Sequence, residues 1–167
     1  MELRKQDFIQ IVDDNRGIIK SLCRVYYRGV EDQQDAFQDI ILQLWKSFAT
    51  FRGESEVGTW IYRVSLNTIL NKIRKDKRSV TVEPIDIPQF SISTAKADDN
   101  VELLSLIIQS LKDVDKAIVV LYLEGYRTKE IADILSLSQT NVTTRLNRVT
   151  SKLKMKFNNT SHAARQS

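Results

Sequence analysis

Cysteine and histidine are almost absent from this sequence, which removes most of the side chains used for metal binding and nucleophilic catalysis. Cys23 is the only cysteine and His162 the only histidine. One cysteine cannot form an internal disulfide, and no Cys/His cluster is available to hold zinc. Cys23 lies between Leu22 and Val25 in a helical pattern, where we expect a small buried hydrophobic side chain. The composition thus predicts a protein that is not an enzyme and needs neither a metal nor a cofactor.

Long apolar runs are also missing. A membrane-spanning helix needs roughly 18 or more consecutive apolar residues, and no stretch approaches that length. The polar start of the chain lacks the apolar segment of a secretory signal. We therefore expect a cytoplasmic protein with no membrane insertion.

Acidic residues are absent from the last part of the chain. None follows Asp133, whereas basic residues continue to Arg165. Another basic cluster occurs earlier, where five of the seven residues from 72 to 78 are basic. The net charge is only +4, so the placement of the charges says more than their sum. Two separated basic segments predict two contacts with one polyanion.

What the sequence does contain is helical periodicity. Apolar residues recur at steps of three and four in most of the chain, and this spacing is typical of amphipathic helices. The expected helical ranges are 8–26, 32–48, 57–77, 100–110, 113–124, 128–135 and 139–156. The periodicity fails between these groups, where Pro84 and Pro88 argue against a strand. We predict an all-α protein with two small helical domains, 1–79 and 100–157, a flexible linker over 80–99, and a frayed tail over 158–167.

The second half has the layout of a helix-turn-helix. Residues 128–135 form one short helix, residues 136–138 a turn, and Gln139 begins the next helix. Gly125 suits the end of the preceding helix and Ser138 the start of the last one. In this motif the second helix enters the major groove of DNA.

The outward face of that last helix carries groups that read base edges. At about 100° per residue, Thr143, Thr144, Asn147 and Arg148 point away from the apolar side. Arginine pairs with guanine and asparagine with adenine, while threonine offers a hydroxyl and a methyl group. The alternative is an ordinary amphipathic helix with a solvated basic face.

The helix expected over 57–77 carries a second polar stripe. Its members step by three or four residues: Arg63, Asn67, Asn71, Arg74 and Arg78. Trp60 projects onto the same stripe, away from Ile61 and Ile69. An exposed aromatic beside cations is suited to single-stranded nucleic acid, because each stacked base contributes about 1–3 kcal/mol. The alternative is a tryptophan buried by the preceding loop.

Three segments of the chain together resemble a known family. Residues 51–67, which include Phe-Arg-Gly-Glu-Ser and Thr-Trp-Ile-Tyr-Arg, resemble the promoter-melting segment of extracytoplasmic-function (ECF) sigma factors. Residues 35–45 resemble their helix that binds core RNA polymerase, and residues 111–153 their domain four. Both domains match in the right order. The chain is thus identified as a member of this group, whose proteins bring polymerase to promoters and open them.

The resemblance implies a role for each segment. Core polymerase would be bound by an acidic face of one helix, with the residues Asp35, Gln38, Asp39, Leu42 and Gln43. The downstream (−10) element would be captured and melted by Trp60, Arg63, Asn67, Asn71, Arg74 and Arg78, with Phe51 completing the pocket. The upstream (−35) element would be read as a duplex by Thr140, Thr143, Thr144, Arg145, Asn147 and Arg148. An anti-sigma factor is a further partner suggested by the resemblance alone.

Some positions depart from the family pattern. Family members often carry glycine at the positions of Ser136 and Thr140 and lysine at that of Thr143, so the preference for a −35 sequence cannot be transferred from relatives.

Two other functions would also account for parts of the sequence. One alternative is a stand-alone helix-turn-helix regulator. The other is a metal-dependent nuclease that uses Asp32, Asp35 and Asp39. Only the sigma factor accounts for both basic segments and the acidic face.

Overall fold

The chain forms two compact units, Met1–Leu103 and Leu104–Ser167. The computed structural model describes residues 2–79 and 107–163, and within these two ranges every regular element is a helix. The all-α prediction is confirmed. The predicted linker over 80–99 and most of the helix predicted over 100–110 lie outside the described residues. No helix in the described ranges has the length and apolar character needed to cross a membrane.

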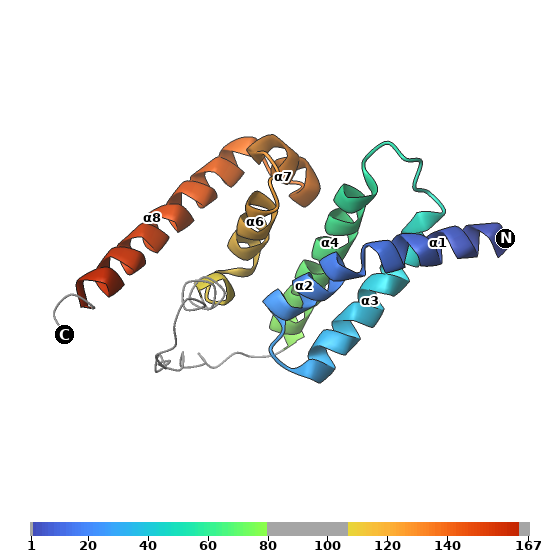
Figure 1. Cartoon of the computed structure of the whole chain (residues 1–167), viewed down its shortest axis with the longest axis horizontal. Helices are drawn as coiled ribbons and strands as arrows, with labels where there is room; N and C mark the ends of the chain where they lie inside the picture. Colours follow the sequence, from blue (N-terminus) through green and yellow to red (C-terminus); the bar gives the residue numbers. More distant parts are fainter. Residues whose placement is uncertain (1, 80–106, 164–167) are drawn as a thin grey trace. The chain divides into compact units, whose positions relative to one another are not determined.

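The described part of the first unit contains four helices: α1 (Glu2–Asp14), α2 (Arg16–Tyr26), α3 (Val30–Phe48) and α4 (Val57–Ser79). α3 and α4 run side by side, and α2 packs against both (Figure 1). The single helix predicted over 8–26 is therefore wrong. It is divided at Asn15, whose side-chain amide donates to the Ile11 carbonyl at 2.9 Å and so competes with the helical hydrogen bonds.

The core of the first unit follows the predicted apolar periodicity. Its fully buried side chains come from α2, α3 and α4: Ile19, Leu22, Ile40, Leu44, Ile61, Leu66 and Ile69. Burying one such side chain contributes about 1.5–3 kcal/mol. Aromatic rings extend this core, because Phe8 of α1 contacts both Trp45 and Phe48 of α3, with centroid distances of 5.0 and 5.4 Å.

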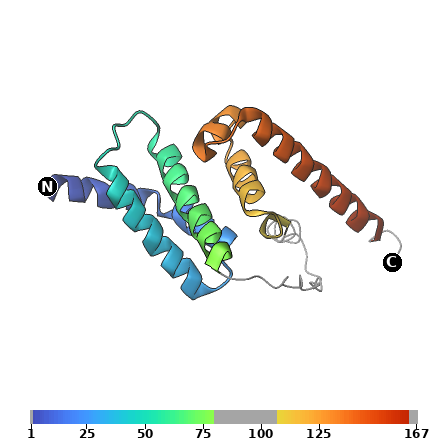
Figure 2. The same cartoon turned by 180° about the vertical axis from the view of Figure 1, so that it is seen from behind.

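The second unit contains α6 (Asp113–Leu123), α7 (Thr128–Leu135) and α8 (Gln139–Ala163), as Figure 2 shows from behind. Both predicted helix ends are confirmed. Gly125 has φ +92° just after α6, a conformation that glycine adopts without strain. The Ser138 hydroxyl accepts the Asn141 N–H at 3.1 Å. α8 continues to Ala163, so the frayed tail does not begin at residue 158 as predicted.

The buried thiol of Cys23 gives a test of the packing in the first unit. Burial raises the pKa of Cys23 from 9.0 to about 11. Since the thiolate is the reactive form, alkylation by iodoacetamide at pH 8 should be at least about 100-fold slower in the folded protein than in urea. Mass spectrometry of timed samples measures both rates. Equal rates would contradict the packing around α2.

Candidate functional site

A pocket of about 370 Å³ lies where α3, the loop 49–56 and α4 meet. Its lining combines two aromatic rings with polar and charged groups: Ser47, Thr50, Phe51, Arg52, Glu54, Ser55, Trp60 and Arg63. Gly53 allows the loop to turn, because its φ of +72° is left-handed. The loop connects α3 to α4 (Figure 1), and Phe51 within it contacts Trp60 near the start of α4.

Trp60 does not lie on an exposed face, so that prediction is wrong and the alternative of burial by the preceding loop is right. The side chain is only 6% exposed. Phe51 stacks on it with a centroid distance of 4.7 Å and an interplanar angle of 28°, and Phe48 packs beside it at 6.3 Å. Helical projection places Trp60 on the polar stripe of α4, but the free energy gained by burying the three rings against one another decides where the side chain lies. Trp60 still lines the pocket, together with Phe51.

Arg63 gives the pocket its hydrogen-bonding character. Its Nε atom is buried and has no acceptor among the described residues. An unpaired buried donor costs about 1–3 kcal/mol, and such groups are rare unless a ligand or water completes them. Arg63 also lines the pocket, so its guanidinium group lies beside the two aromatic rings.

The rest of the α4 stripe is exposed as expected. Asn67, Asn71, Arg74 and Arg78 all face solvent. Asn67 and Asn71 share a groove of about 390 Å³ with Gln43 of α3. Gln43 was predicted to bind polymerase, yet it lies beside two residues predicted to bind DNA. Helical spacing could not reveal this, because the residues belong to different helices.

The acidic face of α3 is partly neutralised within the protein. Asp35 and Gln38 are exposed, but the Asp39 carboxylate accepts a hydrogen bond from Lys72 Nζ at 2.7 Å. This bond raises the pKa of Lys72 above its usual value. Lys72 was assigned to the basic segment that meets nucleic acid. A cation already sits against Asp39, which argues against the nuclease alternative, since a divalent ion would be repelled there.

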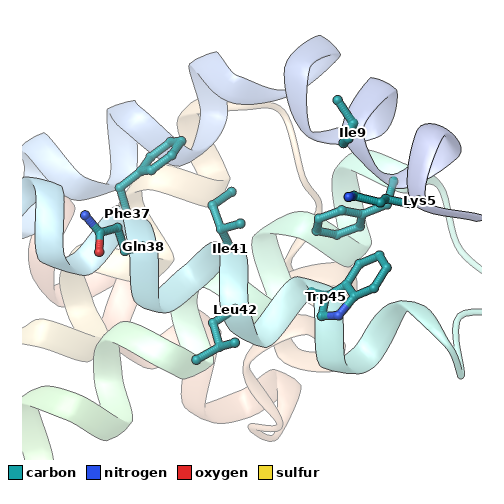
Figure 3. Close-up of a pocket in the computed structure, with 8 residues that line it drawn as sticks. Lys5, Ile9, Phe37, Gln38, Ile41, Leu42 and Trp45 are labelled. Atoms are coloured by element: carbon teal, nitrogen blue, oxygen red, sulfur yellow. The ribbon is translucent and has the colours of Figure 1, made fainter. Parts of the chain in front are cut away.

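An apolar groove of about 500 Å³ lies between α1 and α3 (Figure 3). Gln38 and Leu42, two of the predicted polymerase-binding residues, line it beside Ile41 and Trp45. Leu42 is 49% exposed. Lys5, Phe8 and Ile9 complete the lining from α1. The sequence predicts no separate role for α1, because its apolar residues do not differ from those of a helix that only covers a core.

The helix-turn-helix is formed by α7, the turn and α8. Ala132 and Val142 are buried between the two helices, at 4% and 0% exposed. Four of the predicted reading residues are exposed on α8: Thr140, Thr143, Thr144 and Asn147. Their exposure leaves them available to a ligand on that face. Whether they read DNA stays a prediction.

The two arginines of the predicted reading set do not extend freely from α8. Arg145 Nη1 donates to Asp115 Oδ1 at 2.8 Å, and Arg148 Nη2 donates to Asp115 Oδ2 at 2.9 Å. Arg145 Nε also donates to Asn141 Oδ1 at 2.6 Å. Asp115 belongs to α6, and sequence reasoning missed it, because nothing local to α6 marks a partner 30 residues away.

Comparison with known proteins places both units in one family. Sigma-70 region 2 matches residues 11–79 and Sigma-70 region 4 matches residues 102–153. The ECF RNA polymerase sigma factor SigM of Mycobacterium tuberculosis is 24% identical over 87% of this chain and 74% of its own length. The ECF RNA polymerase sigma-E factor of Escherichia coli is 30% identical over 69% of this chain and 68% of its own length.

A solved structure shows the same fold. The sigma factor RpoE of Bartonella quintana, crystallised with the anti-sigma factor NepR, superposes with a TM-score of 0.63 and 15% identity. The match covers 93% of this chain and 96% of that one. Two domain families in the right order, relatives spanning most of the chain and a shared fold agree: the chain belongs to the ECF group of RNA polymerase sigma factors.

Proposed function

We propose that the chain directs core RNA polymerase to specific promoters and helps to open them. Residues 1–79 bind polymerase and the −10 element, and residues 100–157 read the −35 element. The observation that carries the proposal is the pocket of Phe51, Trp60 and Arg63, which combines an aromatic wall with an unpaired buried donor. That combination suits an unstacked base, which needs stacking surfaces and hydrogen-bonding groups in place of those it leaves.

The pocket captures one base of the separated strand. Extruding a base costs a few kcal/mol of stacking and pairing. Phe51 and Trp60 supply replacement contacts, and the Arg63 guanidinium, which lines the pocket, offers N–H donors to a base carbonyl or ring nitrogen. Asn67, Asn71, Arg74 and Arg78 follow along exposed α4, where polar and cationic groups hold the neighbouring backbone. A rigid buried tryptophan serves this purpose better than a mobile exposed one, since less freedom is lost on binding.

Core polymerase binds the face of α3 that carries Asp35, Gln38, Asp39 and Leu42. The face offers carboxylates around an exposed leucine, and sigma factors of this group bind a basic coiled coil of the polymerase. Complementary charge orients such a partner, while the apolar groove beside Leu42 supplies burial. Gln43, which lies with Asn67, belongs with the DNA-binding residues instead.

Three further properties follow from this role. The chain contributes binding rather than a reaction of its own, so it is not an enzyme. It acts in the cytoplasm, where bacterial core polymerase is found. An anti-sigma factor is a partner, by analogy with the Bartonella quintana sigma factor in complex with NepR. A stand-alone helix-turn-helix regulator would not need the pocket lined by Phe51, Trp60 and Arg63.

Run-off transcription tests the proposed function. Purified bacterial core polymerase is supplied with genomic fragments, with and without this protein. Discrete start sites that depend on the protein are the expected result. If none appears and the protein also fails to retain core polymerase in a pull-down, the proposal is overturned. If it retains polymerase without initiation, the role in promoter opening is overturned.

The Arg63 donor gives a sharper prediction in the same assay. Arg63→Gln should slow promoter opening by about tenfold, because one hydrogen bond to the captured base is lost, while affinity for core polymerase stays unchanged. Permanganate footprinting of unpaired thymines follows opening directly. Arg4→Gln is the matched control, since it makes the same change on the exposed side of α1. Equal opening by the two variants would contradict the role of Arg63.

A further inference from the structure

Asp115 is a buried carboxylate that no recognised role of this protein explains. It lies in the first turn of α6 and is 5% exposed. Its two oxygens bind two different arginines of α8, Arg145 at 2.8 Å and Arg148 at 2.9 Å. A buried carboxylate is strongly unfavourable without partners, and charge-assisted hydrogen bonds to arginine offset that cost. Asp115 therefore ties α8 to α6 through both arginines.

The arginines remain only partly occupied by this contact. Their side chains are 32% and 50% exposed, whereas Asp115 is enclosed. Arg148 uses Nη2 for Asp115, and Arg145 uses Nη1 for Asp115 and Nε for Asn141. The other N–H groups of each guanidinium have no acceptor within the described part of the chain. Each arginine is thus held at one edge and keeps donors for a ligand.

We propose that Asp115 is a positioning residue for reading the upstream element, an inference that rests on the proposed function. A free arginine samples many rotamers and loses that freedom when it meets a base edge or a phosphate. Asp115 fixes Arg145 and Arg148 before DNA arrives, so that their remaining donors project from α8 with a defined spacing. It also offsets one of the two positive charges, which lowers attraction to DNA of any sequence.

The fixing of the two arginines and the offset of one positive charge distinguish a positioning role of Asp115 from that of an ion pair that only stabilises the fold. Loss of the carboxylate should weaken discrimination between sequences while it strengthens binding to random DNA. A carboxylate that only braces α6 against α8 would, when removed, weaken both kinds of binding together as the unit loosens. The direction of the change in random-sequence binding therefore decides between them.

The experiment compares full-length wild type, Asp115→Asn and Asp115→Glu. Holoenzyme binding is measured on a promoter found by run-off transcription, with its upstream element intact or scrambled. For Asp115→Asn we expect the intact-to-scrambled ratio to fall about tenfold. The full-length protein alone is then titrated with random duplex DNA at several salt concentrations. There the slope of log affinity against log salt should steepen by about 1.

Asp115→Glu keeps the charge and moves the carboxylate by one methylene. It should retain the wild-type salt slope and show a ratio between those of wild type and Asp115→Asn. If urea unfolding shows that Asp115→Asn does not fold, the ratio and the salt slope of Asp115→Glu test the inference instead. A wild-type ratio in both variants, or parallel loss of both kinds of binding, overturns the inference while the proposed function stands. A wild-type holoenzyme with no preference for the intact element overturns the upstream role and this inference together.

Discussion

Trp60→Ala is expected to lower the free energy of unfolding of the first unit by about 3–5 kcal/mol. The indole is 6% exposed and lies between Phe51 and Phe48, so truncation leaves a large cavity. Polymerase binding and promoter opening should therefore fall together. A tryptophan that only stacked on DNA would lose opening alone.

The two tryptophans of the chain make this prediction easy to measure. Trp45 and Trp60 are the only ones, and both lie in the first unit, so tryptophan fluorescence in urea reports on that unit alone. Trp45→Ala is the matched control, since this side chain is 40% exposed and its loss should cost about 1–2 kcal/mol. Equal destabilisation by the two substitutions would show that Trp60 is not part of the core.

Asp39→Lys should weaken binding to core polymerase by roughly 2–5 kcal/mol, the range seen when one member of an interfacial charge pair is lost. The substitution reverses a charge in the middle of the acidic face of α3. It also places a second cation beside Lys72, whose Nζ lies 2.7 Å from the Asp39 carboxylate. That pair is partly exposed, so stability should change by less than about 1 kcal/mol.

Two controls separate the contact with polymerase from the contact with Lys72. Asp13→Lys makes the same charge change on exposed α1 and should leave polymerase affinity near the wild-type value. A double exchange, Asp39→Lys with Lys72→Asp, restores an ion pair between α3 and α4 but not the acidic face. Affinity, measured by biolayer interferometry with immobilised core enzyme, should stay low in the double variant. Full recovery would mean that Asp39 acts only through Lys72.

The turn between α7 and α8 forms where the sequence predicts it, but its backbone is strained at Ser136, which the sequence pattern did not reveal. Ser136 has φ 55°, a left-handed conformation in which a side chain costs roughly 1–2 kcal/mol. Glycine would adopt this conformation without that cost, which agrees with the glycine that the family resemblance implies at this position. The turn still forms, because the Leu137 N–H donates to the Ala132 carbonyl at 2.9 Å and the flanking helices bury Ile131, Ile134 and Val142.

Most of the helices, their caps at Gly125 and Ser138, and the helix-turn-helix were predictable from the sequence, because they depend on spacing within about four residues along the chain. The division of the first predicted helix at Asn15 was not. The exposed face of α8 and the polar stripe of α4 follow from the same periodicity. The enclosure of Trp60 by Phe51 was not predictable, since helical projection describes one helix and takes no account of the loop that folds over it.

The partners of the charged groups were also decided only by the tertiary structure. Asp39 meets Lys72, and Asp115 meets Arg145 and Arg148, across separations of 30 or more residues. Local spacing could assign each of these residues to a charged face, but a buried or half-buried charge is stabilised by whichever opposite charge packing brings within about 3 Å. The sequence by itself determined which surfaces are acidic or basic. Helix packing decided which charges remain available to polymerase and DNA.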